Sequence, residues 1–278
     1  MTIRKVLNSL VTYLVLVIIV VIGMFPLVWM VMASFRTNID IISEPLGFSM
    51  SWDTAVTNYD QVWNQRNFKL YIRNSAVITA STVLGCLLLG VPCAYGLSRF
   101  QFRYKNDVGF WILSQRFMPL IAVAGPIFLT ISALGLLNTH IGLILPYIAI
   151  NLPISVWIMR RFFDDIPSDL DQAAMVDGAT RWQTLWRILL PLSLPGLVTT
   201  AILVAIFTWN EFLIGLFIVN TPQVQTVPIG ASGLLSAERA VSWNTMTAVG
   251  TLTVMPVVIF SLFIQRYIVR GLTAGAIR

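Results

Sequence analysis

The sequence predicts an all-α protein embedded in a membrane, and three observations support this. Hydrophobic residues make up 57% of the 278 positions and charged residues 11%, with a mean hydropathy of +0.80, whereas a soluble domain carries about 25% charged residues. Six apolar runs are each about 20 residues long, which is enough to cross a bilayer as a helix. Lys and Arg are also distributed unevenly between alternate loops, as in multi-pass membrane proteins.

The six predicted spans belong to a single domain over residues 1–278. They cover residues 10–33, 74–97, 108–134, 141–159, 195–219 and 247–269. The first run is too long for a cleaved signal peptide and no small-residue cleavage site follows it, so it is expected to be an anchored helix. Prolines within or beside nearly every span predict kinks, which suit either a pathway that opens to both sides or static packing.

The loops on one side of the predicted bundle hold twelve of the 18 Lys and Arg residues, the other loops hold five, and Arg116 lies within a span. Cationic loops stay in the cytoplasm, so both termini and the loop over 164–191 are expected to be cytoplasmic, and the loops over 34–73 and 220–246 external. This topology accounts for the net charge of +6 without a nucleic-acid partner.

The sequence favours no catalytic role for this chain. It has no GxxxxGK[ST] phosphate loop, no metal-ligand cluster and no nucleophile beside a base. Cys86 and Cys93 are seven residues apart in one apolar run and are interpreted as packing residues. His140, in a short external turn, is expected to be solvated. If ATP is used, another chain must bind it, so no cofactor is expected here.

The most informative segment is the polar loop over 164–191, between two predicted spans. Ser168 with Asp171, and Thr180 with Gln183, have the spacing of helix capping boxes, and Gly178 between them is a left-handed helix stop. The loop is therefore predicted to form two short helices that meet at a sharp bend.

Each short helix has a predicted contact face. The first places Leu170, Ala173 and Ala174 on one face, where small side chains would let another protein approach closely. The second carries an apolar stripe at i, i+3, i+4 and i+7 that ends at Pro191. Its members are Trp182, Leu185, Trp186 and Leu189.

The spacing of this loop resembles the EAA motif in the permease subunits of bacterial ABC importers, and its flanks resemble the carbohydrate (maltose-type, second permease subunit) family. The matching residues are Gln172, Ala173, Ala174, Asp177, Gly178, Ala179, Ile188, Pro191 and Pro195. The family's usual Glu is Gln172 here, which keeps the acceptor and the length but loses a charge. Softer similarities are the YGLSRFQF pattern that ends the second span, LGLLNTHIGLILPY, TWNEF and the GLTAGAIR tail.

This resemblance implies a type I ABC importer permease fold in the bacterial inner membrane, surrounded by lipid. It also implies a second homologous permease, a dimer of ATPase subunits that holds ATP and Mg, an extracytoplasmic substrate-binding protein and a carbohydrate substrate. The loop would be the coupling helix that docks on the ATPase. Its coupling residues would be Leu170, Gln172, Ala173, Ala174, Asp177 and Gly178.

Two ionisable residues fall inside predicted spans, where charges are rare and face protein or water. At 1.5 Å per residue, Arg116 lies about 12 Å along the third span and Glu211 about 24 Å along the fifth, so separate partners are expected. Arg116, Asn210 and Glu211 are the candidates for lining a pathway or contacting substrate, although a structural role is slightly favoured for both charges.

The external loop over 220–246 is predicted to make an irregular excursion and then a short helical piece around 234–241. The family resemblance implies that this loop reaches into the binding protein. The contact candidates are Gly230, Ala231, Ser232, Gly233 and Leu234.

Three other interpretations stay open: an ABC permease for another substrate class, an ion-coupled secondary transporter and a membrane scaffold. The carbohydrate-type loop argues against the first. A secondary transporter would need more acidic residues in its spans than Glu211.

Overall fold

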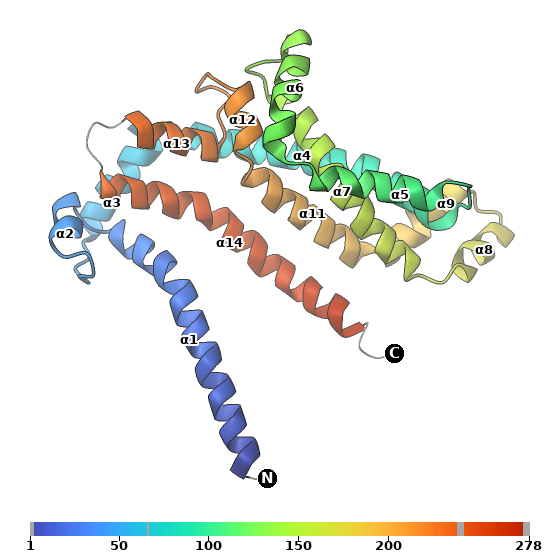
Figure 1. The fold of residues 1–278 in the computed structure, drawn as a ribbon, viewed down its shortest axis with the longest axis horizontal. Helices are drawn as coiled ribbons and strands as arrows, with labels where there is room; N and C mark the ends of the chain where they lie inside the picture. Colours follow the sequence, from blue (N-terminus) through green and yellow to red (C-terminus); the bar gives the residue numbers. More distant parts are fainter. Residues whose placement is uncertain (1–2, 66, 238–241, 275–278) are drawn as a thin grey trace. The chain divides into compact units, whose positions relative to one another are not determined.

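The structure is a computed structural model that describes residues 3–65, 67–237 and 242–274, and every regular element within these ranges is a helix (Figure 1). The helices are α1 (Ile3–Ala33), α2 (Asn38–Ser43), α3 (Trp52–Asp60), α4 (Phe68–Arg99), α5 (Lys105–Ser114), α6 (Leu120–Ala133), α7 (His140–Asp164), α8 (Asp169–Val176), α9 (Arg181–Thr184), α10 (Leu190–Leu192), α11 (Leu194–Trp209), α12 (Leu213–Ile218), α13 (Val227–Ala237) and α14 (Trp243–Ala274), with the short turns η1 (Gln61–Gln65), η2 (Gln115–Phe117) and η3 (Leu185–Leu189).

Within the single predicted domain, the chain divides into two compact units. Unit 1 contains Met1–Lys69 and Ala231–Met255, and unit 2 contains Leu70–Gly230 and Pro256–Arg278. Helices α4, α13 and α14 each contribute residues to both units.

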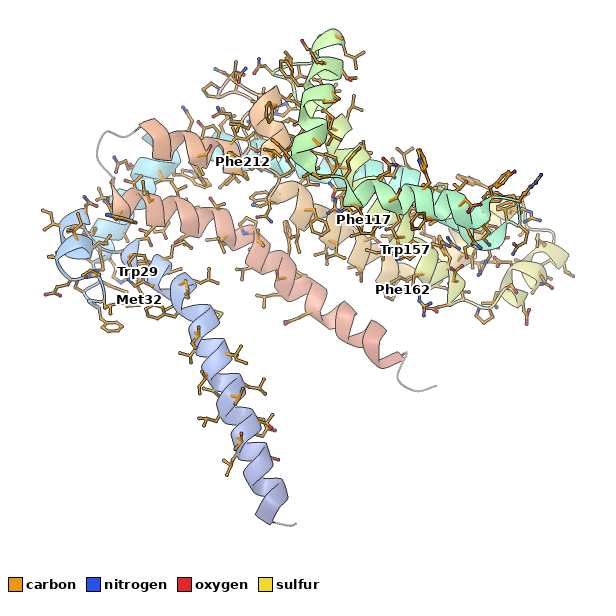
Figure 2. All side chains as sticks on the ribbon, viewed as in Figure 1. Trp29, Met32, Phe117, Trp157, Phe162 and Phe212 are labelled. Carbon is orange, nitrogen blue, oxygen red and sulfur yellow. The ribbon has the colours of Figure 1, made fainter. Side chains whose placement is uncertain are left out.

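Four helices in the described part of the chain are long and apolar enough to cross a membrane, and two bent helix pairs would bring the number to six. The four include α1, α4 and α7, together with Trp243–Phe263 of α14, so they coincide with the first, second, fourth and sixth predicted spans. The apolar window of α1 has no buried residue within the chain, and Figure 2 shows its side chains projecting all around the helix. These exposed apolar surfaces are suited to lipid or to another membrane subunit.

The third predicted span is not one continuous helix. Helices α5 with η2 and α6 are inclined by 97° to each other across Met118 and Pro119. Pro119 has no amide hydrogen and disfavours the helical conformation of the preceding residue, and Met118 accordingly has an extended backbone with ψ 127°.

The fifth predicted span is also interrupted. Helix α11 ends at Trp209, and the chain resumes as the short α12 after a three-residue break. Before this span, the segment Arg181–Leu192 meets Leu194–Trp209 at 80°. Hydropathy therefore located both apolar runs, whereas the breaks depend on local backbone conformation that hydropathy does not report.

Unit 1 orders the loop over residues 34–73 around a buried amide. The side-chain amide of Asn58 donates to the carbonyl oxygens of Ser34 at 2.9 Å and Arg36 at 3.2 Å. Its carbonyl oxygen accepts a 2.8 Å hydrogen bond from Asn244 at the start of α14. The buried guanidinium of Arg36 donates to the carbonyl oxygens of Asp40 and Glu44. Polar side chains thus hold α2 and α3 against the ends of α1 and α14.

Unit 2 has two hydrophobic clusters along α7. This helix contacts α5, α11 and α12. The first contains Ile78, Ala124, Ile131, Leu143, Tyr147, Ile214, Ile218, Val219 and Val224. The second contains Val91, Ala94, Tyr95, Leu97, Val156, Met159, Phe163, Leu185 and Leu189. Cys86 and Cys93 are free cysteines in α4, the first buried and the second half-buried, in agreement with the packing role predicted for them.

Asn74, near the start of α4, is hydrogen-bonded to two other segments of unit 2. Its amide donates to the carbonyl oxygens of Gln223 at 2.9 Å and Gln225 at 3.0 Å. Its carbonyl oxygen is 3.0 Å from Nε2 of His140. Because that oxygen can only accept, the histidine must donate. His140 therefore holds the start of α7 against α4, and the prediction of a merely solvated loop residue is wrong.

Candidate functional site

The predicted coupling segment forms α8 and α9 at one end of unit 2 (Figure 1). Gly178 has φ +86°, the left-handed conformation expected of a helix stop. Its amide donates to the carbonyl oxygen of Met175, and the Ala179 amide donates to that of Ala174. This is the Schellman arrangement that closes a helix C-terminus.

The predicted capping box at the start of α9 is confirmed. The hydroxyl of Thr180 accepts from the Gln183 amide at 3.2 Å, and the side chain of Gln183 accepts from the Thr180 amide at 2.8 Å. These local bonds fix the bend between the two helices.

The other predicted capping box, between Ser168 and Asp171, is wrong. Ser168 has helical backbone angles and makes no side-chain cap hydrogen bond. The Asp171 carboxylate instead lies 2.5 Å from Nε of Arg99, with the side chains only 10% and 11% exposed. The Asp171 side chain therefore points toward the buried guanidinium as its ion-pair partner and not back toward the start of α8.

The end of α4 holds the segment through two further contacts. Arg99 also donates through Nη2 to the carbonyl oxygen of Ile166 at 2.9 Å. Its neighbour Ser98 donates to Oδ1 of Asp164 at 2.5 Å. Adjacent residues at the C-terminus of α4 therefore bind the end of α7, the linker and the first turns of α8.

Aromatic contacts hold the α9 side of the segment. The Tyr95 hydroxyl donates to the carbonyl oxygen of Arg181 at 3.4 Å. The Arg181 guanidinium stacks 4.8 Å from the centroid of the Phe100 ring, which in turn packs edge-on against Tyr95. Cation–π contacts of this kind contribute about 0.5–2 kcal/mol, so both short helices are fixed to the same end of α4.

One face of α8 is covered by the chain itself and the other is open. Ala174 is 6% exposed and lies one turn from the buried Asp171. Leu170 is 42% and Val176 88% exposed, and Gln172, Ala173 and Asp177 are also exposed. The expectation that Ala174 shares an open docking face with Leu170 and Ala173 is therefore wrong, because Ala174 is turned toward the side that Arg99 holds. All residues of α8 other than Asp171 and Ala174 are exposed, and Asp177 after it is exposed too.

The predicted apolar stripe of the second short helix is split. Leu185 and Leu189 are fully buried, whereas Trp182 is 58% and Trp186 38% exposed, with their rings packed edge-on at 5.6 Å. The π-helical turn η3 over Leu185–Leu189 departs from the α-helical period on which the stripe was based. The leucines anchor this helix in the second cluster while the tryptophans face outward.

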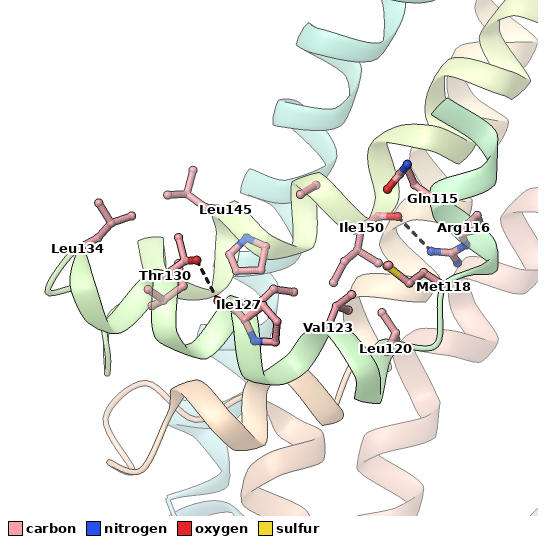
Figure 3. A pocket seen from close by; sticks show the side chains of 14 residues that line it. Gln115, Arg116, Met118, Leu120, Val123, Ile127, Thr130, Leu134, Leu145 and Ile150 are labelled. Atoms are coloured by element: carbon pink, nitrogen blue, oxygen red, sulfur yellow. Dashed lines mark hydrogen bonds between the residues drawn. The ribbon is translucent and has the colours of Figure 1, made fainter. Parts of the chain in front are cut away.

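Arg116 lies at the bend between α5 and α6, beside a cavity of about 740 Å³ (Figure 3). Its guanidinium donates to the carbonyl oxygen of Ile150 at 3.2 Å and lies 4.6 Å from the Phe207 ring centroid. Apart from Gln115, Arg116 and Thr130 the lining is apolar, and Thr130 donates to a backbone carbonyl of its own helix. These contacts support a structural role for Arg116, because a sugar site needs several convergent polar groups.

Glu211 lies in the break between α11 and α12. Its two carboxylate oxygens accept from the backbone amides of Ile214 at 2.9 Å and Gly215 at 3.2 Å. Asn210 donates back to the carbonyl oxygen of Ile206 at 2.8 Å. The carboxylate thus caps the positive end of α12, and the three pathway candidates are satisfied by separate backbone groups rather than brought together.

The loop over 220–246 is more regular than predicted, because α13 begins at Val227 and not near residue 234. Pro228 is compatible with the first turn of a helix, and Ser75 accepts a 2.8 Å hydrogen bond from the Val227 amide there. The sequence predicts a helical piece around residues 234–241. Residues 234–237 of that range belong to α13, and residues 238–241 lie outside the described residues.

Only some of the predicted contact residues of this loop are open. Gly230 is buried, and a Cβ placed on it would lie 2.2 Å from the Tyr71 ring, so it serves packing. Ala231 and Ser232 are half-buried and Gly233 is exposed. The side chain of Leu234 lies outside the described residues.

Sequence reasoning missed the part that Ser98, Arg99 and Asn74 play in positioning these segments. Arg99 counted only as one of the cationic loop residues and Asp171 only as a helix cap. The available signal was the pairing of one cation at the end of the second span with four acidic residues in the loop 164–171, but spacing alone does not select the partner.

Comparisons with known proteins give a consistent result. Residues 86–274 match the family described as binding-protein-dependent transport system inner membrane component. The trehalose/maltose transport system permease protein MalG of Thermococcus litoralis is 35% identical over 264 residues, 94% of each chain. The sulfoquinovosyl glycerol transport system permease protein SmoH of Agrobacterium fabrum is 33% identical and covers 94% of this chain and 91% of its own. A solved bacterial ABC transporter involved in alginate import contains a chain of the same fold, with TM-score 0.78, 23% identity and coverage of 96% and 98%.

Proposed function

This chain belongs to the family of binding-protein-dependent transport system inner membrane components, and from that premise we propose that it is the membrane-spanning permease subunit of an ATP-driven importer for a sugar or sugar derivative. Its fold is that of a type I ABC importer permease. In this proposal the chain carries substrate by alternating access and leaves ATP hydrolysis to another chain. We assign ATP and Mg to a dimer of partner ATPases, and place a second permease beside this one.

The carbohydrate assignment rests on the relatives that span nearly the whole chain. MalG is named for trehalose and maltose and SmoH for sulfoquinovosyl glycerol, so their substrates share polyhydroxylated sugar units. The chain aligns with both over more than nine-tenths of its length. Ligand identification on the binding protein encoded with this permease would name the sugar, and a bound amino acid or inorganic anion would contradict the assignment.

The observation that carries the coupling role is the geometry of α8. Its inner face is fixed to α4 by the pair between Arg99 and Asp171, at 2.5 Å. Its outer face presents Leu170, Ala173 and Val176 to the surroundings. A helix that is held on one side and presents apolar residues among polar ones on the other can transmit a push from a bound partner to α4 and α7. We propose that the ATPase docks on this outer face.

The distribution of Lys and Arg supports an orientation in which α8 and both termini face the cytoplasm. In that orientation α13 lies on the external side, where the open Gly233 and its half-buried neighbours Ala231 and Ser232 are candidates for contact with the binding protein. Transport would then proceed when closure of the ATPase dimer moves α8.

Cysteine cross-linking tests the docking face. In a background with Cys86 and Cys93 replaced by alanine, Ala173→Cys should cross-link to the assembled ATPase, whereas Ala174→Cys should react poorly because that residue is covered by its own chain. Equal cross-linking at both positions, or none at Ala173→Cys in a complex that still assembles, would contradict the proposed face.

A further inference from the structure

A second cavity of unit 2 lies between α5 and α7, next to the loop that leads into α8. Its volume is about 350 Å³, and it is lined by Asn106, Phe110, Trp157, Arg160, Arg161 and Asp164. Two guanidinium groups face one carboxylate, so the lining carries a net positive charge. Neither the proposed docking face nor the predicted pathway uses these side chains.

The cavity depends on close packing between its two helices. A Cβ placed on Gly109 of α5 would lie 2.6 Å from Nη1 of Arg160, so the guanidinium packs directly against this glycine. Within the described residues, Arg160 has one acidic partner, Asp164, at 3.6 Å. The other oxygen of Asp164 accepts a 2.5 Å hydrogen bond from the Ser98 hydroxyl. Only one carboxylate oxygen of Asp164 is therefore paired with Arg160.

Arg161 adds a cation that protein contacts hold only weakly. Its side chain is 76% exposed, and its ion pair with Asp165 is 3.5 Å long between two exposed groups. Exposed pairs of this kind contribute little. Arg161 can therefore turn toward an anion at the mouth of the cavity at almost no cost in stability.

The remaining walls are aromatic and open. Trp157, labelled in Figure 2 on the part of α7 that contacts α5, is 47% exposed, and Phe110 is 68% exposed. Both residues belong to helices with the apolar composition of membrane spans. Aromatic rings beside cations at the end of a spanning helix are characteristic of the lipid headgroup zone.

We propose that this cavity binds the phosphate of an anionic phospholipid headgroup, with Arg160 and Arg161 contacting the phosphate and Trp157 and Phe110 contacting the upper acyl chains. Basic pockets between spanning helices on the cytoplasmic side recognise anionic lipids in this way. The proposal rests on the orientation given under the proposed function. It extends that function, because the lipid would brace α7 one turn before the loop that leads into α8.

Lipid retention by the assembled importer tests this proposal. The purified complex would be reconstituted in nanodiscs of phosphatidylglycerol and phosphatidylcholine, extracted, and analysed by native mass spectrometry for bound lipid. We expect phosphatidylglycerol to be retained in preference to phosphatidylcholine. Each arginine removed should weaken retention about fivefold, and Arg160→Gln with Arg161→Gln about 30-fold, from the usual contribution of a cation near an anionic surface.

Two variants and one soluble probe make the result decisive. Arg161→Gln alone changes a largely exposed side chain, so its fivefold effect is readable even if the double variant fails to assemble. Arg187→Gln removes another exposed cation, outside this cavity, and should retain lipid as the parent chain does. Glycerol 3-phosphate supplies the phosphate without acyl chains and should not displace the lipid.

Three results would overturn the proposal: unchanged phosphatidylglycerol retention in Arg161→Gln, equal loss in Arg187→Gln, or displacement by glycerol 3-phosphate, which would make this a site for soluble phosphates. Loss of the ATPase from Arg161→Gln with lipid retention intact would instead identify a protein contact. The failure of transport in all variants and the parent chain alike would contradict the proposed function and leave the lipid result readable.

Discussion

Removing the carboxylate of Asp171 should release α8 from the end of α4. Asp171→Ala leaves the Arg99 guanidinium, 11% exposed, without its charged partner. Breaking a buried ion pair from one side costs about 3–5 kcal/mol. Arg99 keeps its 2.9 Å bond to the carbonyl oxygen of Ile166, so we expect a value near the lower end, about 3 kcal/mol.

Hydrogen exchange of the assembled complex, followed by mass spectrometry, measures this release directly. A loss of about 3 kcal/mol corresponds to roughly a hundredfold faster exchange for amides that open with α8. The effect should be confined to the loop over 164–191, while amides in the middle of α4 and α7 keep their protection. Sugar uptake per ATP hydrolysed should fall, because the open face of α8 still binds the ATPase but no longer moves α4.

A double variant separates anchoring from charge. Arg99→Met with Asp171→Leu replaces the buried pair by apolar side chains of similar size, a change that is often neutral or stabilising. Protection of α8 should return in this variant. Unchanged exchange in Asp171→Ala, or faster exchange across the whole of unit 2, would refute the view that this pair holds α8 specifically.

Other substitutions follow from the same contacts. Ala173→Arg should leave the permease folded but without its ATPase, whereas Ala174→Arg should lower the amount of folded permease by inserting a charge into a buried site. Co-purification of the ATPase and the abundance of the permease in the membrane distinguish the two variants. The reverse pattern would place Ala174 on the docking face. Glu211→Ala should lower stability by about 1 kcal/mol through loss of the α12 cap, so uptake should fall only in proportion to the protein in the membrane, and a much larger fall in uptake would indicate substrate contact. Gly230→Ala should destabilise unit 2 by about 1–3 kcal/mol because the new methyl group would meet the Tyr71 ring. Gly233→Ala is its control, because a methyl group there meets nothing within 4 Å. Equal thermal midpoints for the two variants would contradict this packing.

The sequence was sufficient wherever a feature depended on neighbouring residues. The Thr180 capping box and the left-handed Gly178 are formed within a few residues of chain, and the structure has both. Hydropathy located the helices for the same reason, because each apolar run is continuous in sequence. The bend between α5 and α6 escaped it, since Pro119 interrupts backbone hydrogen bonding without lowering hydropathy enough to divide the run.

Features that depend on distant partners could not be read from spacing. Asp171 had the correct spacing for a helix cap, and only the fold brings Arg99, 72 positions earlier, within 2.5 Å. The burial of Ala174 follows from the same approach, because the helix face that carries Asp171 is the face that is covered. Periodicity identifies which residues share a face but does not say which face meets the rest of the protein.

Uptake into proteoliposomes tests the central claim most directly. The permease pair, the ATPase and the binding protein would be reconstituted together, and entry of the labelled sugar identified on the binding protein would be measured. We predict uptake that requires both ATP and the binding protein, is blocked by vanadate, and is absent with Ala173→Arg but present with Arg187→Gln. Uptake that continues without ATP, or that follows an imposed ion gradient, would contradict the claim that this chain is the permease of an ATP-driven importer coupled through α8.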